Sequence, residues 1–454
     1  MFKKIEIWIL YLIIILFFPA LIFVASLVRQ ELVGTQKLGK ISRAALFLGE
    51  IPVNFKKILS GKIDYSEVPD RFPDLNGFNG TPNSRESYLL LSTYDGDLRE
   101  GIVELVDLTN FKVLHTWNPD IDNFNKSIQK IDDFKFVNRD NKNSRYLLWQ
   151  PILLKDGGLV FHHRSPLRKI DACSNLIFQN QKDLFHHSIE TDIEGNIWVP
   201  SHIYPKSLPI EKVGRDIIAE KGYVDDGIVK LSPEGKILFE KSLSQIFLDN
   251  GLEYLIFSMG SVNFRSDPLH LNDIQPVDFD GEFWKKGDVF LSLRNQSMVL
   301  LYRPSTNKII WKGTGPFFHQ HDVDILNDNQ ISVFNNNSKK FASGDVVDGH
   351  NEVMIYDFKT NEYSSYLKDS LIENDVRTIT GGISEIITNG DLFVEETNYG
   401  RTIYLNSDGS LRWTHVNRGE NGKIYRVNWS RILYNKEDIQ NVSNFLVSRN
   451  KCND

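Results

Sequence analysis

Short apolar runs, separated by turns rich in Asp, Asn and Gly, fill most of the chain after residue 87. Such runs, bounded by turn residues, are typical of β-strands. The stretch DLFHHSIETDIEGNIWVPSHIY at residues 183–204 shows the pattern clearly. A run that begins at His186 and His187 is followed by an Asp-Ile-Glu-Gly-Asn turn and then by a second apolar run. The stretch therefore predicts a β-hairpin with two histidines at its start.

The same succession of strands and turns occurs six times between residues 88 and 416. Four antiparallel strands per unit, repeated around an axis, are typical of a β-propeller. A β-sandwich with a second domain is the alternative, but the turns fall at matching places in all six units. We therefore expect an all-β, six-bladed β-propeller. The tail from residue 423 begins with Ile424, Val427 and Trp429 and is expected to supply the strand that closes the ring.

The units average about 55 residues, which is longer than the roughly 40–45 residues of a compact blade. The excess lies in three insertions, at residues 207–223, 245–267 and 339–350. Loops on one face of a scaffold commonly carry binding and catalytic residues. These insertions are therefore expected to shape specificity.

Residues 5–28 form an almost wholly apolar run preceded by Lys3 and Lys4. The run is long enough to cross a hydrocarbon core of about 30 Å as a helix. The leading lysines favour an orientation with the N-terminus inside, which three basic residues on the far side weaken: Lys37, Lys40 and Arg43. An uncleaved signal anchor is favoured over a cleaved signal peptide. In both cases the body lies outside the cytoplasm, in the periplasm or the extracellular space.

Three parts follow from these patterns. Residues 1–30 are expected to form the signal anchor, residues 31–87 a stalk that docks on the propeller, and residues 88–454 the propeller with its closing tail.

The chain has a net charge of −7 and no long basic run, which argues against a nucleic-acid partner. Cys173 and Cys452 are the only cysteines, and export permits a disulfide, although two unpaired thiols fit equally well.

Aligning the units on their first turn brings one residue of each to a shared position. His187, His321, Gln150 and Gly382 lie eight residues before a turn residue, and Asn272 lies nine before one. The shared position is the entrance of the innermost strand. Because innermost strands line the central channel of a propeller, these side chains are expected to point at one small volume near the axis.

Three chemistries fit two channel histidines. Histidine can serve as a nucleophile or as a general acid or base. It can also help to hold an anionic group, here with Lys339, Lys340 or Arg401 as cations. Several neutral imidazoles can instead bind a metal such as zinc. No HExxH, CxxC or Walker-type spacing occurs, so we expect neither a metal ion nor a cofactor.

Three segments resemble the bacterial arylsulfotransferase family: HHSIETDIEGNIWVP, HDVDILNDNQISVFNNN and GISEIITNGDLFVEETNYGRTIYLNSDGSLRW. The resemblance covers roughly residues 147–416. It implies an exported six-bladed propeller that moves a sulfuryl group from a phenolic ester to another phenol without a nucleotide donor. His187 and His321 are similar to the two channel histidines that contact the sulfuryl group. The family's nucleophile, a third histidine that becomes sulfated, is matched by Gly382, with Ser384 close by.

The resemblance makes an arylsulfotransferase-like activity the first hypothesis, with an aryl sulfate or phenol as substrate. His187 and His321 would be the catalytic residues. Five residues are expected to bind substrate: Lys339, Lys340, Arg401, Gln150 and Asn272. The alternatives are a non-catalytic, membrane-tethered propeller that binds an anionic ligand, glycan or protein, and a metal-dependent propeller enzyme.

Overall fold

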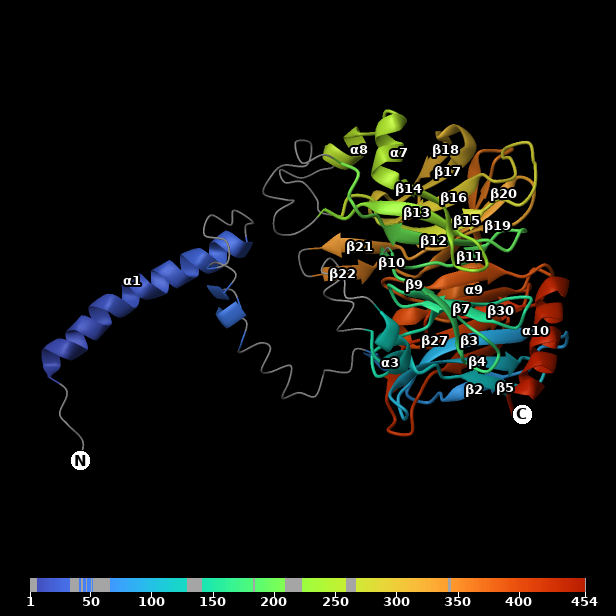
Figure 1. Cartoon of the computed structure of the whole chain (residues 1–454), viewed down its shortest axis with the longest axis horizontal. Coiled ribbons are helices and arrows are strands. Elements are labelled where there is room, and N and C mark those ends of the chain that lie inside the picture. The colour runs from blue at the N-terminus through green and yellow to red at the C-terminus, as the bar shows by residue number, and fades with distance from the viewer. Residues whose placement is uncertain are drawn as a thin grey trace. The chain divides into compact units, whose positions relative to one another are not determined.

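The computed structural model describes residues 6–32, 41, 44–45, 47–49, 51, 66–128, 141–182, 184–208, 223–258, 267–341 and 344–453. The chain divides into two compact units, Met1–Tyr65 and Ser66–Asp454. Figure 1 shows both units and labels their elements where there is room. Of the segment expected to form the stalk, residues 31–87, most of the part between residues 33 and 65 lies outside the described residues.

The first unit contains helix α1 (Ile7–Leu32). Its large apolar side chains are exposed: Leu16 is 60% and Phe18 is 59% accessible. Exposure of so many apolar side chains is unfavourable in water and acceptable in lipid. By length and composition, the segment Ile7–Arg29 can cross a membrane.

The second unit consists mainly of antiparallel sheets, and six of them are the blades of a β-propeller. The strands of blades one to three are β30 (Arg431–Leu433), β3 (Tyr88–Asp95), β4 (Glu100–Asp107) and β5 (Lys112–Trp117); β6 (Trp149–Leu153), β7 (Leu159–His162), β8 (Leu167–Ile170) and β9 (Leu176–Asn180); and β10 (Leu184–Phe185), β11 (Glu190–Thr191), β12 (Ile197–His202), β13 (Asp226–Leu231) and β14 (Ile237–Ser242).

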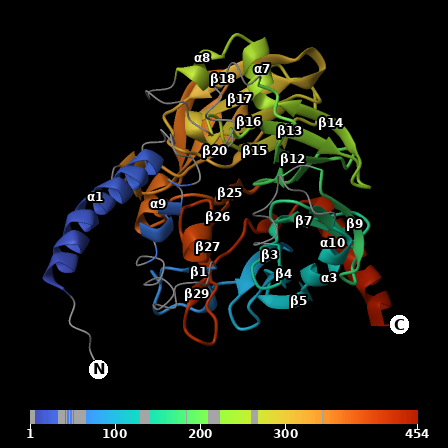
Figure 2. The same cartoon turned by 60° about the vertical axis from the view of Figure 1, so that its left-hand side comes forward.

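The strands of blades four to six are β15 (Leu271–Pro276), β16 (Val289–Leu293), β17 (Met298–Arg303) and β18 (Lys308–Thr314); β19 (Val323–Ile325), β20 (Gln330–Asn335), β23 (Glu352–Asp357) and β24 (Glu362–Tyr366); and β25 (Ile383–Ile386), β26 (Leu392–Glu396), β27 (Arg401–Leu405), β28 (Leu411–Val416) and β2 (Gly77–Gly80). The blades follow one another around a common centre (Figure 2). The predicted all-β, six-bladed propeller is therefore confirmed.

The ring is held together by hydrophobic clusters between neighbouring blades. For example, Phe161 of blade two packs in one cluster with Leu90 of blade one, and Val160 of blade two packs in another with Val199 of blade three. Four further clusters join blades three to four, four to five, five to six and six to one. Because each blade buries apolar side chains on both faces, its strands need one apolar residue after another, as the sequence provides.

A strand from the C-terminal tail completes blade one. Strand β30 is the innermost strand of blade one and pairs with β3, with Leu433 opposite Tyr88. A second closure comes from β2, which adds a fifth strand to blade six by pairing with β28. A two-stranded sheet also joins β1 (Glu67–Val68) to β29 (Ile424–Tyr425). Pairing across the ring leaves fewer unpaired strand edges.

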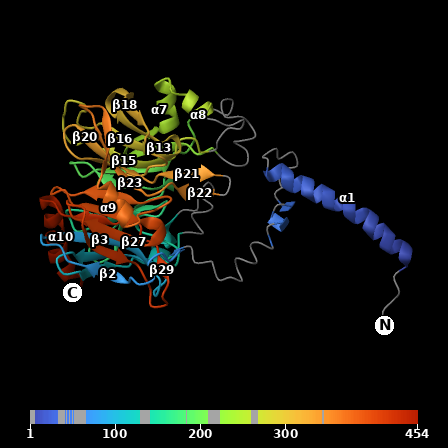
Figure 3. The ribbon, with the colours of Figure 1, turned by 180° about the vertical axis from the view of Figure 1, so that it is seen from behind.

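The insertions differ in structure. The predicted insertion at 207–223 lies almost wholly outside the described residues, whereas that at 245–267 overlaps α7 (Leu243–Asp249) and contains α8 (Tyr254–Phe257). The insertion in blade five forms a separate hairpin of β21 (Ser338–Phe341) and β22 (Gly344–Val347). Figures 1 and 3 show this hairpin projecting from the blades. The other helices are α3 (Ile121–Phe124), α9 (Lys368–Glu373), α10 (Lys436–Arg449) and the 3-10 turns η1 (Asn125–Ser127), η3 (Arg294–Gln296), η4 (Pro304–Thr306), η5 (Thr397–Tyr399) and η6 (Asn450–Asn453).

Helix α10 follows the closing strand and is fixed to the propeller. Its residues Val442 and Phe445 are buried in the cluster between blades one and two. Beyond α10, Cys452 forms a disulfide with Cys173, which lies in the turn between β8 and β9. Of the two states that the sequence left open for these cysteines, the structure thus has the bridge. It cross-links the closing tail to blade two, which restricts the unfolded chain.

Candidate functional site

Hydrogen bonds near the channel tie successive inner strands together. In each, a backbone amide donates to a side-chain oxygen of the preceding blade. The pairs are Ile189 N with Gln150 Oε1 (2.6 Å), Ile274 N with Ser188 Oγ (3.2 Å), Val323 N with Asp273 Oδ2 (3.0 Å) and Ser384 N with Asp322 Oδ2 (2.9 Å). The donors lie two residues after His187, Asn272, His321 and Gly382, so these four positions are equivalent around the ring.

His187 and His321 come together at the centre of the ring. Their ring centroids lie 6.2 Å apart, and the indole of Trp429 lies 5.9 Å from the first and 6.1 Å from the second. Trp149 and His270 also contact His187, at 5.9 Å and 5.0 Å. These five residues come from blades one to five. The structure therefore brings together the two histidines that the sequence assigned to the channel, while their chemical roles remain predictions.

Residues with positive φ recur at the channel end of the inner strands. The angle is +37° at Gln150, +58° at His187 and at His270, +52° at His319 and +61° at Trp429. This conformation costs of order 1–3 kcal/mol for a residue with a side chain. Positive φ angles recur at one end of the ring. This recurrence indicates that the surrounding structure holds the backbone in this conformation, which directs these side chains toward the channel.

The hydrogen bonds of His321 fix its tautomer. The backbone amide of Gly381 donates to Nε2 (3.0 Å), so that nitrogen carries no proton and Nδ1–H donates to Asn336 Oδ1 (2.5 Å). Asn336 is oriented in turn by donating to the carbonyls of Thr378 and Gly381. Burial, together with the field of Arg294, lowers the pKa of His321 well below its usual value. His321 is therefore a neutral group whose lone pair is already engaged.

His187 keeps one ring nitrogen open to a ligand. Its Nδ1 lies 2.7 Å from Nδ1 of His186, whereas no described residue hydrogen-bonds to its Nε2. Burial, with the fields of His186 and His270, lowers the pKa of His187 well below its usual value. Of the two predicted catalytic histidines, His187 is therefore the one available to contact a substrate.

His270 and Asp267 form a pair that sequence analysis did not identify. The Asp267 carboxylate accepts a hydrogen bond from Nδ1 of His270 (2.6 Å), which leaves the lone pair of His270 on Nε2. The same arrangement orients the histidine base in nucleophile–base–carboxylate triads. Because the His270 ring contacts that of His187, the pair places a base beside the channel histidines.

Arg294 is the cation of this cluster. It follows β16, and its backbone amide donates to the carbonyl of His270 (3.0 Å). Its charge acts on both His187 and His321. The Nε of Arg294 is buried and has no hydrogen-bond partner among the described residues, and its closest acidic group, Asp345, is 3.9 Å away. An anionic ligand would satisfy this guanidinium.

The two lysines expected to help the histidines lie on the hairpin of β21 and β22, and neither forms a hydrogen bond or ion pair with His187 or His321 among the described residues. Lys339 and Lys340 are on the projecting hairpin, where Lys339 pairs with Asp348 (2.5 Å) and Lys340 is exposed. Lys340 acts electrostatically on His319, whereas Arg294 acts on both channel histidines. Arg294 therefore has the better position for the cationic role.

The other predicted binding residues hold the fold together. Arg401 is buried, forms an ion pair with Glu396 and donates to the carbonyl of Asn374 (2.9 Å). Gln150 bridges to blade three, since its Oε1 accepts from Ile189 N and its Nε2 donates to Glu190 (3.1 Å). Asn272 donates to the carbonyl of Gln320 in the next blade (2.9 Å). Each of the three thus donates a hydrogen bond within the protein, whereas Oδ1 of Asn272 is buried and has no hydrogen-bond partner among the described residues.

Gly382, which the resemblance matches to the family's third histidine, has no room for a side chain. Gly382 has a φ of +86°, and a Cβ there would lie 2.6 Å from Phe334 Cε1, 2.6 Å from Thr378 Cγ2 and 3.0 Å from the carbonyl oxygen of Glu395. Local packing therefore excludes a histidine side chain at position 382. The adjacent amide of Gly381 instead engages His321.

Replacing Gly382 with alanine should destabilise the fold more than replacing Gly287. Both glycines have nearly the same φ, +86° and +88°, but nothing lies within 4 Å of a Cβ at Gly287. Both substitutions bring the positive-φ penalty, and only Gly382→Ala adds overpacking of about 1–3 kcal/mol. Urea denaturation measures the difference. Equal losses of stability would show that the pocket around residue 382 can expand.

Carboxylates gather below the histidines on the channel axis. Asp322, Asp324, Glu190 and Glu385 line a cavity of about 30 Å³, together with Arg431, which binds Glu190 at 3.0 Å and 3.2 Å. Burial raises the pKa of Glu385 to about 7, and burial with neighbouring carboxylates raises those of Asp322 and Asp324 well above their usual values. The cavity is far smaller than the roughly 300–1,000 Å³ of ordinary ligand pockets, so it does not admit an aryl sulfate.

Fold and site together define a six-bladed β-propeller with histidines at one end of its channel. A family model described as Arylsulfotransferase (ASST) matches residues 150–418, and the chain belongs to this family. The resemblance seen in the sequence is thus confirmed. No curated protein matches the chain.

Solved structures match the chain at low similarity. A protein of unknown function from Bacteroides caccae is 10% identical, with a TM-score of 0.45 and coverage of 77% of this chain and 99% of that one. TolB from Acinetobacter baumannii is 9% identical, with a TM-score of 0.39 and coverage of 87% and 73%. The Pan2 WD40 domain from Neurospora crassa is 10% identical, with a TM-score of 0.40 and coverage of 79% and 97%. These likenesses are too weak to bear on function.

Proposed function

We propose that this protein transfers a sulfuryl group from an aryl sulfate to a phenol without a nucleotide donor. The observation that carries the proposal is the convergence of His187, His270 and Arg294, beside the locked His321, in a chain of the arylsulfotransferase family. A sulfuryl group presents three oxygens and negative charge. A guanidinium with a free N–H and neutral imidazoles are suited to hold it.

The aromatic walls suit the rest of the substrate. Trp149 and Trp429 both lie 5.9 Å from His187, as measured between ring centroids. Flat indole faces bind aromatic rings by stacking or edge contacts, worth about 0.5–1.5 kcal/mol beyond the area buried. Phenyl groups of donor and acceptor therefore have partners next to the reacting sulfur.

The transfer is a single displacement, because no histidine occupies position 382. His270 Nε2 takes the proton from the acceptor hydroxyl, and the acceptor oxygen forms a bond to sulfur as the bond from sulfur to the donor oxygen breaks. The donor leaves as a phenolate and takes up the proton from His270. Arg294 and Nε2–H of His187 hold the sulfuryl oxygens, whose charge they stabilise throughout.

The proposal includes a location. Helix α1 is proposed to be an uncleaved signal anchor, with Lys3 and Lys4 on the inner side and the propeller in the periplasm or outside the cell. A transferase that needs no nucleotide donor can act there, because it does not depend on cofactors from the cytoplasm. The disulfide between Cys173 and Cys452 supports an oxidising location.

The test uses the full-length chain in detergent with 4-nitrophenyl sulfate as donor and phenol as acceptor. We expect release of 4-nitrophenol that depends on the acceptor, with phenyl sulfate detected by mass spectrometry. Arg294→Ala and His187→Ala should each lower the rate about 10²–10³-fold. His115→Gln, in the outer strand β5 of blade one, is the control and should keep the full rate. Binding of the donor without any transfer would identify a binding propeller and refute the proposed function.

A further inference from the structure

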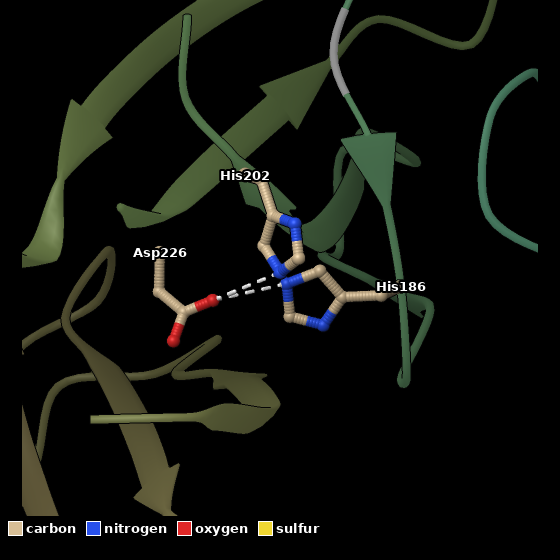
Figure 4. Close-up of side chains that lie close together, drawn as sticks. All are labelled: His186, His202 and Asp226. Atoms are coloured by element: carbon tan, nitrogen blue, oxygen red, sulfur yellow. Dashed lines mark ion pairs between the residues drawn. The ribbon is translucent and has the colours of Figure 1, made fainter. Parts of the chain in front are cut away.

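A second group of ligating side chains lies beside the channel, in blade three. His186 follows β10, His202 ends β12 and Asp226 begins β13. These strands are neighbours in the sheet, and His202 and Asp226 are directly paired across β12 and β13. Figure 4 shows the two imidazoles and the carboxylate turned toward one another. We call these residues the blade-three cluster.

Two of the three atoms that face one another in the blade-three cluster have no hydrogen-bond partner among the described residues. Nε2 of His186 lies 3.2 Å from Oδ1 of Asp226, and Nε2 of His202 lies 3.5 Å from the same oxygen. His186 Nε2 and Asp226 Oδ1 are both buried and form no hydrogen bond of acceptable geometry among the described residues. Asp226 is 2% exposed and His186 is 7% exposed. Buried polar atoms normally have a hydrogen-bond or metal partner, so a partner is expected between these two imidazoles and the carboxylate.

The spacing fits a metal ion at the centre. One ligand atom from each of the three residues lies within 4.8 Å of the others. Ligand bonds of about 2.0–2.2 Å in a tetrahedral site put neighbouring ligand atoms about 3.3–3.5 Å apart. The two separations from Asp226 Oδ1, 3.2 Å to His186 Nε2 and 3.5 Å to His202 Nε2, are close to these ligand–ligand distances. A carboxylate that only accepted hydrogen bonds would bring the imidazole nitrogens to about 2.7–2.9 Å.

The surroundings would hold such a site in place. The other oxygen of Asp226, Oδ2, accepts a hydrogen bond from the backbone amide of Leu271 (3.0 Å). Nδ1 of His186 lies 2.7 Å from Nδ1 of His187. Hydrogen bonds from the far side of metal ligands commonly fix their orientation. Asp267, whose Oδ1 is buried and unpaired, acts electrostatically on both His186 and His202 and adds negative charge near a cation.

We propose that His186, His202 and Asp226 bind one divalent transition-metal ion, with zinc as the best fit. Two imidazoles and one carboxylate are ligands of zinc sites that keep a fourth position open. The proposal does not depend on sulfuryl transfer. It has a consequence for the channel, however. With Nε2 of His186 on the metal, its Nδ1–H donates to His187, so that Nε2–H of His187 points toward the ligand side.

Metal binding is measured directly on the full-length chain in detergent. After dialysis against a chelator and then against Zn²⁺, elemental analysis should find one zinc per chain. Zn²⁺ should also raise the melting temperature, because an ion that binds only the folded state stabilises it. Co²⁺ in its place should give a visible absorption spectrum of a four-coordinate nitrogen and oxygen site.

The variants make the test specific. Asp226→Asn and His202→Gln should each weaken Zn²⁺ binding at least 100-fold and abolish the rise in melting temperature, whereas His115→Gln should bind as the wild type does. His202 is the more exposed ligand, with 25% of its side chain accessible, so His202→Gln remains informative if the buried Asp226→Asn fails to fold. Less than one ion per chain in the wild type, or unchanged binding in the variants, would overturn the proposal.

Discussion

Replacing His270 with alanine should lower the rate of sulfuryl transfer about 10²–10⁴-fold, which is the usual contribution of a positioned general base. Phenols ionise only near pH 10, so at neutral pH the acceptor needs a base to release its proton. His270 is the histidine whose Nε2 lone pair is set by a carboxylate, through the 2.6 Å hydrogen bond from Nδ1 to Asp267. His321 cannot substitute for it, because Gly381 N–H already occupies its Nε2.

Replacing Asp267 with asparagine keeps His270 but removes the carboxylate that orients it, and so tests whether this orientation is needed. An amide NH₂ at this position favours a lone pair on Nδ1 of His270, and thus the wrong tautomer, so the rate should also fall by orders of magnitude. Acceptor-dependent release of 4-nitrophenol measures both variants, with His115→Gln as control. Zinc content in the same preparations shows whether Asp267→Asn acts through the blade-three cluster. A His270→Ala variant with the wild-type rate would contradict the assignment of the base.

The propeller could be predicted because each blade repeats a local pattern. Alternating apolar runs and Asp-Gly or Asn-Gly turns are set by the strands themselves, and every blade needs two apolar faces. The closing strand was harder to place. The alternation at Ile424, Val427 and Trp429 pointed to the tail, but the strand begins at Arg431, after the positive φ of Trp429.

The site was predicted only in part, since it depends on which residues lie opposite one another. The spacing to the first turn of each unit identified His187 and His321. In blade four the same spacing identified Asn272, which occupies the equivalent position but donates its hydrogen bond to the next blade. His270, two residues earlier, reaches the cluster instead. Arg294 joins it because Leu271 pairs with Leu293, which brings the next residue beside His270. Such a cross-strand register is not visible from spacing along one strand.

Lys339 and Lys340 were placed near the channel histidines for a related reason. Nearness in sequence to the second histidine suggested nearness in space. The intervening segment instead turns outward into β21 and β22, which pair only with each other among the described strands. A local hairpin satisfies its own backbone hydrogen bonds, so it can leave the blade without loss. The direction in which an insertion projects depends on where it enters and leaves the blade. The residues within the insertion do not determine that direction.

The buried carboxylates on the axis make a second large effect measurable. Burial raises the pKa of Glu385 from its usual 4.5 to about 7, although Tyr434 donates a hydrogen bond to it (3.0 Å). Because the folded state holds this proton to a higher pH than the unfolded chain does, the group stabilises the fold fully below about pH 4.5. This contribution is lost as the pH rises through about 7. The difference corresponds to about 3 kcal/mol.

Replacing Glu385 with glutamine should therefore change stability little at pH 5 and raise it by about 2–3 kcal/mol at pH 8.5. The amide resembles the protonated carboxyl and still accepts from Tyr434, but it never has to carry a buried charge. Urea denaturation at the two pH values measures the difference between variant and wild type, in which the opposite contributions of the buried histidines cancel. Glu86→Gln is the matched control, since Glu86 also accepts from a tyrosine hydroxyl, that of Tyr88, but is exposed. A Glu385→Gln variant that gains no stability at pH 8.5 would mean that the channel carboxylates are ionised and share a bound cation.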